Sequence, residues 1–370
     1  MTEAAAYAPV DERSDAWYVH EHYRRDGRRR RALRAFYRVK PLIPRAAQLA
    51  LRRAGARRQR RMAFPAWPYE DVLLRRRAAA LRAALSAEGV DRVPIVGLWP
   101  EGKRFAWVLT HDVEGPLGLQ RVESLLAVER RHGCVSSWNL CARWYPITDA
   151  DLERIRRGGG EIGLHGLHHD DRLFRDRASF EASLDDIRGY MERWGAEGFR
   201  SPAMHRNAAW MHELPCRYDS SFPHSDPFQA RPGGCCAIHP FFFGDVVELP
   251  VTLEQDFTLF ELLRERTIDL WKDKSRWIIR HHGLINVIVH ADYMTAERLE
   301  RYEELLVFLR EQPDGWHAAP RDVARWWRAR SRLSVRTGDD GVPTIAGDGA
   351  DERARIEFAR SGPDGLCYER

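Results

Sequence analysis

Four predicted strands end in short runs of acidic, imidazole or guanidinium side chains. These runs cover residues 110–114, 165–170, 200–202 and 290–293. In parallel α/β folds the loops that follow the strands converge at their carboxyl ends, and functional sites lie there. We therefore expect the four runs to meet at one rim of the fold.

His165 and His169 have the spacing i, i+4, which places two imidazoles on one side of a helical turn, as in H-x-x-x-H metal sites. An isolated pair is as often part of a histidine-rich polar loop. A carboxylate from the first run, Asp112 or Glu114, lies two βα units upstream and could reach the same rim. Two imidazoles and one carboxylate leave a position open for water, which is typical of a catalytic metal.

The elements that must position these residues alternate between strand and helix from residue 103 onward. Strands are predicted over 104–110, 135–140, 161–165, 198–202, 218–222, 246–251 and 284–290. Helices are predicted over 118–133, 149–157, 176–194, 258–272, 295–311 and 320–331. Repeated βα units with apolar strands indicate a parallel sheet covered by helices, and six or seven units favour a barrel over an open sheet.

Three parts of the chain are expected. Residues 1–100 form a basic, mainly helical extension, with one helix over 69–89 that ends at a glycine. Residues 101–331 form the α/β barrel, and residues 332–370 form a peripheral tail with short β-like pieces.

The extension contains a strongly basic segment, residues 24–62, with sixteen arginines or lysines and one acid, Asp26. Its short helices would carry a thin apolar stripe. A solvated surface packed on the main domain is the first interpretation, contact with an anionic membrane surface the second. Nucleic acid is not expected as a partner, because aromatic residues are sparse and no recognition fold is visible. Only four of the 59 basic residues are lysines, which weakens any inference from arginine richness.

Composition excludes several classes of protein. With 44% hydrophobic and 31% charged residues the chain can form a core, and no apolar run approaches the ~20 residues of a membrane-spanning helix. The N-terminus lacks the pattern of a secretory signal, and the six cysteines include no C-x-x-C pair. We expect a cytoplasmic protein, with membrane association through residues 24–62 as an option, and without disulfides or a zinc ribbon.

Residues 103–330, about 60% of the chain, resemble the polysaccharide deacetylase superfamily, the NodB-homology domain of carbohydrate esterase family four. The matched motifs are the D-x-D/E variant at 110–114, H-x-x-x-H at 165–169, R-x-P at 200–202, a looser match at 218–222 and 248–256, and the late strand 284–293. The resemblance implies an irregular (β/α)7 barrel, in agreement with the strand count.

The resemblance also implies roles for individual residues. Glu114, His165 and His169 would hold the metal. Asp112 would be the general base that takes a proton from water, and His290 would protonate the departing amine.

Two supporting roles follow from the same resemblance. Arg200 would pair with Asp112, and the backbone N–H near Ala203 would stabilise the oxyanion. Glu114 stands where the family usually has the shorter Asp, so an exchange of roles between Asp112 and Glu114 stays open. Ala203 replaces the aromatic residue that often follows R-x-P.

Other polar and aromatic residues near the predicted strand ends complete the candidates. Asp292 could hold His290 in the tautomer needed for acid catalysis. Tyr293, together with Trp138, Trp144 and Trp210, could line a substrate groove, although core packing is at least as common for each. Weaker polar candidates are Glu254, Asp256 and His239.

The predicted function is metal-dependent removal of an N-acetyl or similar acyl group from an amino sugar or glycan precursor. Zinc is the expected cofactor, because it lowers the pKa of water from ~15.7 to ~7, but Co, Ni, Mn or Fe would suit the same donors. Two alternatives stay open. One is hydrolysis of a non-sugar C–N bond, an amide or ureide, on the same scaffold. The other is a catalytically silent protein that binds a glycan or another partner.

Overall fold

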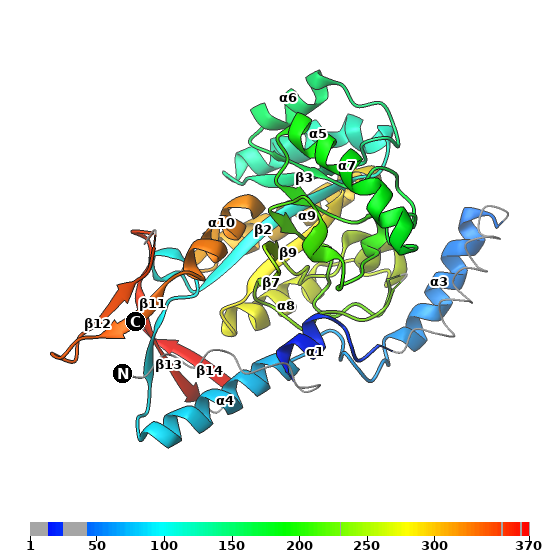
Figure 1. The fold of residues 1–370 in the computed structure, drawn as a ribbon. Helices are drawn as coiled ribbons and strands as arrows, with labels where there is room; N and C mark the ends of the chain where they lie inside the picture. The colour runs from blue at the N-terminus through cyan, green and yellow to red at the C-terminus, as the bar shows by residue number, and fades with distance from the viewer. Residues whose placement is uncertain (1–13, 25–42, 230, 349–350, 363–364, 370) are drawn as a thin grey trace.

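The structure is a computed structural model that describes residues 14–24, 43–229, 231–348, 351–362 and 365–369 (Figure 1). Residues 25–42, nearly half of the predicted basic segment, lie outside the described residues, so the comparison below covers Arg24 and residues 43–62.

Seven parallel strands curl into the barrel that the βα repeats predicted. They are β2 (Phe105–Val113), β3 (Ser136–Leu140), β4 (Glu161–Leu164), β5 (Gly198–Phe199), β6 (Tyr218–Asp219), β8 (Val246–Glu248) and β9 (Leu284–His290). Their order in the sheet is β9-β2-β3-β4-β5-β6-β8. The antiparallel strand β7 (Phe241–Phe243) follows β8 at the edge, and β10 (Gly315–His317) pairs with the start of β2. The fold is therefore the irregular (β/α)7 class expected from the sequence.

The ring closes irregularly, because the chain after β8, rather than a regular strand, reaches β9. The N–H groups of Thr252 and Leu253 donate to the carbonyl of Asn286 at 3.1 and 3.0 Å. In return, Thr252 Oγ1 accepts the N–H of Asn286 at 2.9 Å. The fully buried Asn286 side chain donates to Ser220 Oγ at 2.9 Å and to the Leu249 carbonyl at 3.1 Å. One polar side chain thus joins the two edges of the sheet.

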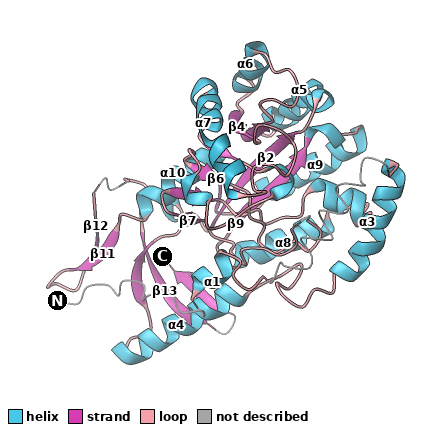
Figure 2. Cartoon of the chain, turned by 45° about the vertical axis from the view of Figure 1, so that its right-hand side comes forward, coloured by secondary structure: helices cyan, strands magenta, loops and turns pink. Residues whose placement is uncertain are grey.

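Helices cover the outside of the barrel (Figures 1 and 2). They are α5 (Pro116–Arg131), α6 (Asp149–Arg157), α7 (Arg177–Trp194), α8 (Asp269–Arg280), α9 (Ala296–Arg310) and α10 (Pro320–Arg330). Local sequence explains several ends: Thr148 and Asp151 form a capping box at α6, and Gly195, with φ 58°, ends α7. Every residue of β2 and β9 is buried, in agreement with the largely apolar sequences of these two strands.

Short helical turns lie in the loops between these elements. They are η2 (Pro100–Gly102), η3 (Pro202–Met204), η4 (Met211–Glu213), η5 (Phe257–Leu262) and η6 (Ala291–Tyr293).

The helix predicted over 258–272 is wrong in its boundaries. The structure has the π-helical turn η5 there, which ends at Leu262, and α8 begins only at Asp269. Arg264 adopts φ +61°, a left-handed conformation that ends the first turn. Helix α8 then extends to Arg280, and its side chains Trp271 and Ile278 are buried against the barrel. The spacing of apolar residues over 258–272 is typical of a helix. The helix is nevertheless interrupted at Arg264, and no glycine in the sequence indicates this left-handed position.

The remaining described elements lie outside the barrel, on two sides of it (Figure 1). On one side are α4 (Val72–Glu88), β1 (Val93–Val96), β11 (Ser334–Thr337), β12 (Pro343–Ala346), β13 (Ile356–Gly362) and β14 (Gly365–Glu369). Helix α3 (Arg45–Gln59) lies on the other side, against η5, and the short α1 (Asp15–Val19) lies between them. The predicted helix over 69–89 is α4, which ends at Gly89. Strand β1 pairs with β13, and β13 pairs with β14, so the N-terminal extension and the C-terminal tail share a sheet.

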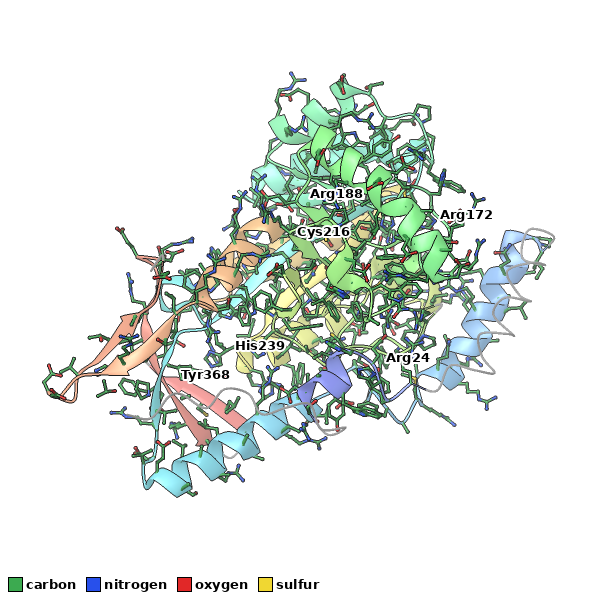
Figure 3. All side chains as sticks on the ribbon, viewed as in Figure 1. Arg24, Arg172, Arg188, Cys216, His239 and Tyr368 are labelled. Carbon is green, nitrogen blue, oxygen red and sulfur yellow. The ribbon has the colours of Figure 1, made fainter. Side chains whose placement is uncertain are left out.

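An aromatic contact connects this sheet to the barrel. The ring of Tyr368 on β14 lies 4.9 Å from that of His282, whose carbonyl faces His239 Nε2 at 3.1 Å; Figure 3 labels Tyr368 and His239. None of the described helices is long and apolar enough to cross a membrane. All six cysteines are free thiols.

The closure contact gives a first prediction. Thr252→Val removes the acceptor of the Asn286 N–H inside the barrel, where an unpaired donor is costly. We expect the free energy of unfolding in urea to fall by about 1–3 kcal/mol. The matched control is Thr344→Val on the exposed strand β12, where the hydroxyl donates to the Arg336 carbonyl at 3.3 Å. Equal losses in the two variants would contradict this account of the closure.

Candidate active site

Strand β2 extends further than predicted and carries the first polar run into the barrel. Asp112 is its penultimate residue and is buried, and Glu114 follows the strand directly. The parallel register sets Asp112 beside Asn139 on β3 and beside His290 on β9. Asp112, Asn139 and His290 therefore lie at the same level of the barrel, near the carboxyl ends of the adjacent strands β2, β3 and β9.

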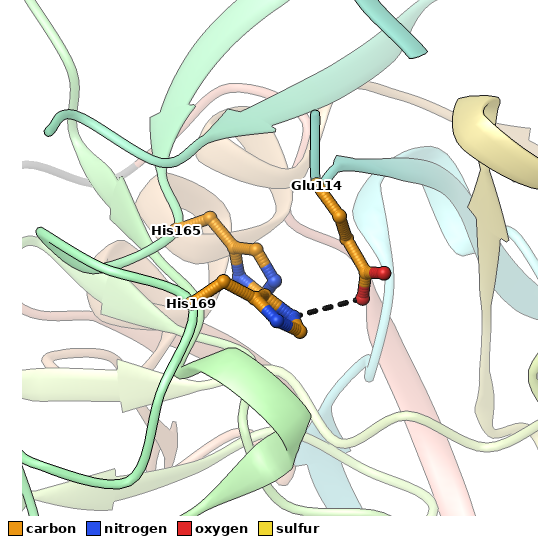
Figure 4. A group of neighbouring side chains, drawn as sticks. All are labelled: Glu114, His165 and His169. Atoms are coloured by element: carbon orange, nitrogen blue, oxygen red, sulfur yellow. Dashed lines mark ion pairs between the residues drawn. The ribbon is translucent and has the colours of Figure 1, made fainter. Parts of the chain in front are cut away.

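Glu114, His165 and His169 come together as a possible metal-binding group (Figure 4). One donor atom from each of the three lies within 4.8 Å of the others. Glu114 Oε1 is 2.9 Å from His169 Nε2. The extra methylene of glutamate lets this carboxylate reach past the end of β2 to the imidazoles, and Asp112 stays below them with its Oδ2 3.8 Å from His165 Nε2.

The two imidazoles present nitrogens suited to a metal ion. His165 Nδ1 lies 3.0 Å from the Arg200 carbonyl and must donate to it, which leaves the Nε2 lone pair free to coordinate. The Nε2 atoms of both histidines are buried and make no hydrogen bond within the described residues, although His169 Nε2 forms an ion-pair contact with Glu114. Burial lowers the pKa of His165 to about 4, so this imidazole is neutral at pH 7. Unpaired buried nitrogens beside a carboxylate fit a divalent cation.

Gly166 allows the histidine loop to lie against the R-x-P turn. It adopts φ +69°, and a Cβ atom there would lie 3.0 Å from the ring of Pro202. A larger residue would be strained at this φ and would push His165 away from Arg200.

Asp112 is arranged to stay ionised although it is buried. Asn139 Nδ2 donates to its Oδ1 at 2.9 Å, and Arg200 Nη1 lies 3.7 Å from the same oxygen. Burial alone would raise the pKa of Asp112, but the Arg200 guanidinium and the nearby histidines lower it below its usual value. Arg200 is held in turn by hydrogen bonds to Thr110 Oγ1 and Ser220 Oγ, both 3.0 Å. The pairing of Arg200 with Asp112 is the arrangement expected from the sequence.

His290 lies across the site from His165, with its Nε2 3.5 Å from Glu114 Oε1. Its Nδ1 is 2.6 Å from Asp256 Oδ1, and its backbone N–H donates to Asp256 Oδ2 at 3.1 Å. Burial would lower the pKa of His290, but the Asp256 carboxylate raises it to about 10. The imidazole is therefore a protonated donor at neutral pH.

The proposed partnership of Asp292 with His290 is wrong. Asp292 Oδ2 accepts the N–H of Glu114 at 2.6 Å, and Oδ1 accepts the N–H of Gly118 at 3.1 Å. The carboxylate thus lies at the N-terminus of α5, where the helix dipole favours negative charge, and it fixes the turn that carries Glu114. A glycine is needed at 118, since a Cβ atom there would lie 2.2 Å from Asp292 Oδ2.

The remaining candidates are distributed between the site and the core. The Tyr293 hydroxyl donates to Glu114 Oε2 at 3.0 Å, so this residue touches the metal-binding group rather than lining a groove alone. Ala203 is exposed at the turn after Arg200, between buried neighbours. Trp138 is fully buried in the core, whereas Trp144 is half exposed.

Sequence reasoning undervalued two residues of the site. Asp256, a weaker candidate in the sequence, lies in the loop between β8 and α8, and the irregular closure brings it to His290. Asn139 on β3 was not singled out, although its position at a strand end was a usable signal.

The contact with Asp256 gives a prediction that separates it from Asp292. In chelator-treated protein, Asp256→Asn should lower the pKa of His290 from about 10, because the largest of the contributions that raise it is removed, as measured by NMR titration. The raised pKa stabilises the fold fully below about pH 6.5, and this contribution is lost as the pH rises through about 10. The variant should therefore lose less stability than the parent over this interval.

Asp292→Asn is the control, because it leaves the contact between His290 and Asp256 intact. A fall in the pKa of His290 in this control, with none in Asp256→Asn, would reverse the assignment.

Comparison with known proteins gave matches among solved structures only. No family model matches the chain, and no curated protein matches it. A Mycobacterium smegmatis protein assigned as a polysaccharide deacetylase is 20% identical, with a TM-score of 0.49, over 63% of this chain and 93% of that one. A probable polysaccharide deacetylase from Pseudomonas aeruginosa is 17% identical, with a TM-score of 0.48, over 62% and 93%.

A third structure, Puue allantoinase, is 16% identical, with a TM-score of 0.47, over 62% of this chain and 92% of its own. Two of these three solved structures are described as polysaccharide deacetylases and one as an allantoinase.

Proposed function

We propose that the protein is a metal-dependent hydrolase that removes an N-acetyl or similar acyl group from an amino sugar or glycan precursor. The observation that supports this proposal is that a buried carboxylate, Asp112, and a buried imidazole, His290, both lie beside one group of potential metal ligands. Asp112 lies near His165, and His290 lies near Glu114. Hydrolysis of an amide needs a base and an acid, because water must lose a proton and the amine must gain one.

Glu114, His165 and His169 would hold the metal, with zinc expected and Co, Ni, Mn or Fe as alternatives. When bound, such an ion supplies positive charge that polarises the acyl carbonyl and acidifies water. Two neighbours keep Glu114 in place: Tyr293 donates a hydrogen bond to its carboxylate, and Asp292 accepts one from its backbone N–H.

The chain's own residues would perform the proton transfers. Asp112, held by Asn139 and Arg200, would accept the proton of the attacking water. His290, oriented by Asp256, would deliver a proton from Nε2 to the departing nitrogen. The backbone N–H of Ala203 would donate to the oxyanion.

The division into residues 1–100, 101–331 and 332–370 and the cytoplasmic location remain predictions from the sequence. In that compartment the substrate would be a small glycan precursor.

Variants at the rim test the proposal directly. Asp112→Asn should keep the bound metal and lose activity by about 100-fold or more, since it removes the general base. His165→Ala should lose both the metal and the activity. His168→Ala is the matched control, because this side chain lies beside Trp144 rather than in the metal-binding group. Metal content by elemental analysis and release of acetate are the measurements.

A substrate panel distinguishes the proposed function from the alternatives. Acetylated amino sugars should be hydrolysed, whereas allantoin and simple amides should not. Turnover of allantoin or simple amides alone would favour hydrolysis of a non-sugar C–N bond. Full turnover in chelator would exclude metal dependence, and lack of metal and of turnover would favour a silent binding protein.

We also propose that residues 24–62 bind an anionic membrane surface. In the described half of this segment, α3 exposes Leu51 together with Arg57 and Arg58, and Arg61 follows the helix. An apolar residue among arginines suits the interface of an anionic bilayer.

Sedimentation with phosphatidylserine vesicles tests this contact. The triple variant Arg57→Gln, Arg58→Gln, Arg61→Gln should bind about 100-fold more weakly, because each basic residue near the surface contributes about 1 kcal/mol. The control removes the same charge from exposed arginines of the barrel: Arg172, Arg188 and Arg193. Failure of the parent protein to sediment at low ionic strength would refute the proposal.

A further inference from the structure

A buried ion pair connects the N-terminal segment, residues 14–24, to the barrel. Glu21 lies just after α1, and its two carboxylate oxygens accept from Arg206 Nη2 at 2.5 Å and Nε at 3.0 Å. Arg206 is fully buried, and Glu21 is 8% exposed. Arg24, labelled in Figure 3, adds a second guanidinium to Glu21 at 3.0 Å. A two-pronged pair of this kind fixes both geometry and distance.

The same arginine also holds the loop that follows the R-x-P turn. Arg206 Nη1 donates to the carbonyl of Met204 at 2.9 Å. Ala203 and Met204 adopt φ +49° and +50°, a left-handed conformation that side chains with a Cβ atom rarely adopt. Two such residues in succession persist only where the surroundings hold them, and such strain is often found at functional sites. The loop is therefore built to keep one particular shape.

The loop of residues 201–206 is held by contacts at both of its ends. At its start, the N–H of Ser201 donates to Ser221 Oγ at 2.8 Å, and the Arg200 carbonyl faces His165 Nδ1. At its end, the Met204 side chain is buried against Val251 and Ile288, and its carbonyl is bound by Arg206. Ala203, between these anchors, is exposed.

The N-terminal segment itself is fixed by further contacts to the barrel. The Tyr23 hydroxyl donates to the Gly234 carbonyl at 2.7 Å and accepts the Gly234 N–H at 2.9 Å. Gly233 must be a glycine, because it has φ +136° and a Cβ atom there would lie 3.0 Å from that hydroxyl. Glu21 is thus presented to Arg206 by a segment with its own attachment.

We propose that Glu21 and Arg206 are positioning residues for catalysis: through the Met204 carbonyl they hold Ala203 in the conformation that aims its N–H at the substrate oxyanion. This inference rests on the proposed function, and it gives the N-terminal segment a part in the reaction although none of its residues is placed at the reacting atoms. Loss of the pair should lower kcat while leaving the metal-binding group, and hence metal content, unchanged.

The test uses the full chain and replaces both members of the buried pair together. Removing Glu21 alone would leave Arg206 buried without a partner, whereas replacing both members of a buried pair by apolar residues is often neutral for stability. The double variant Glu21→Met, Arg206→Met should keep its melting temperature and metal content. On the acetylated sugar that turns over fastest in the panel, kcat should fall by about 10- to 100-fold with KM within about twofold.

The matched control is Asp15→Asn, which removes ion pairs with Arg76 and Arg77 at the start of the same segment. It should have the kcat of the parent protein. Parental kcat in a folded double variant would overturn the proposal, and so would an equal loss in the control.

Amide hydrogen exchange gives a readout that does not depend on activity. Exchange of residues 201–206 should be faster in the double variant than in the parent protein, and unchanged in Asp15→Asn. Unchanged exchange in the double variant would overturn the proposed hold on the loop. If the parent protein hydrolyses no acylated probe, the proposed function fails while this measurement still decides whether the ion pair fixes the loop.

Discussion

The buried charge of Asp112 is the constraint on which the rest of the site depends. A carboxylate inside a barrel is stable in its ionised form only if nearby donors and positive charges replace water. Asn139 on β3 supplies a hydrogen bond, and Arg200, directly after β5, supplies the positive charge. Arg200 then needs its own acceptors, which Thr110 and Ser220 provide. The contacts of Asn139, Arg200, Thr110 and Ser220 around Asp112 follow from this one requirement.

Asp292 and Asp256 have different roles because the backbone around each one points its carboxylate at a different group. Asp292 follows β9 directly, but the 3₁₀ turn η6 points its carboxylate at the N-terminus of α5. Asp256 is 34 residues from His290 in sequence, yet the irregular closure after β8 brings it to the imidazole. Sequence proximity favoured Asp292, because short loops usually keep neighbours together. The direction of a side chain after a turn is a matter of backbone geometry that residue types do not specify.

The appendages connect distant parts of the chain to the barrel. The N-terminal strand β1 and the C-terminal strand β13 pair with each other, and Tyr368 packs on His282 at the start of β9. At the other end of the extension, Glu21 reaches Arg206. Burial of a glutamate and an arginine is unfavourable unless they meet in good geometry, so this contact is specific rather than general surface packing. The extension therefore contacts the loop that follows Arg200 at the candidate site.

Apolar periodicity and strand-end position are local properties, so the amino-acid sequence was enough to predict the alternation of strands and helices, the parallel barrel and most residues of the candidate site. The resemblance of the motifs also predicted the pairing of Arg200 with Asp112. The contacts of Asp256 with His290, of Asp292 with Glu114 and of Glu21 with Arg206 became visible only in the folded chain. These contacts join segments separated by 34, 178 and 185 residues, and such distances are set by how the barrel closes and how the ends of the chain pack on it.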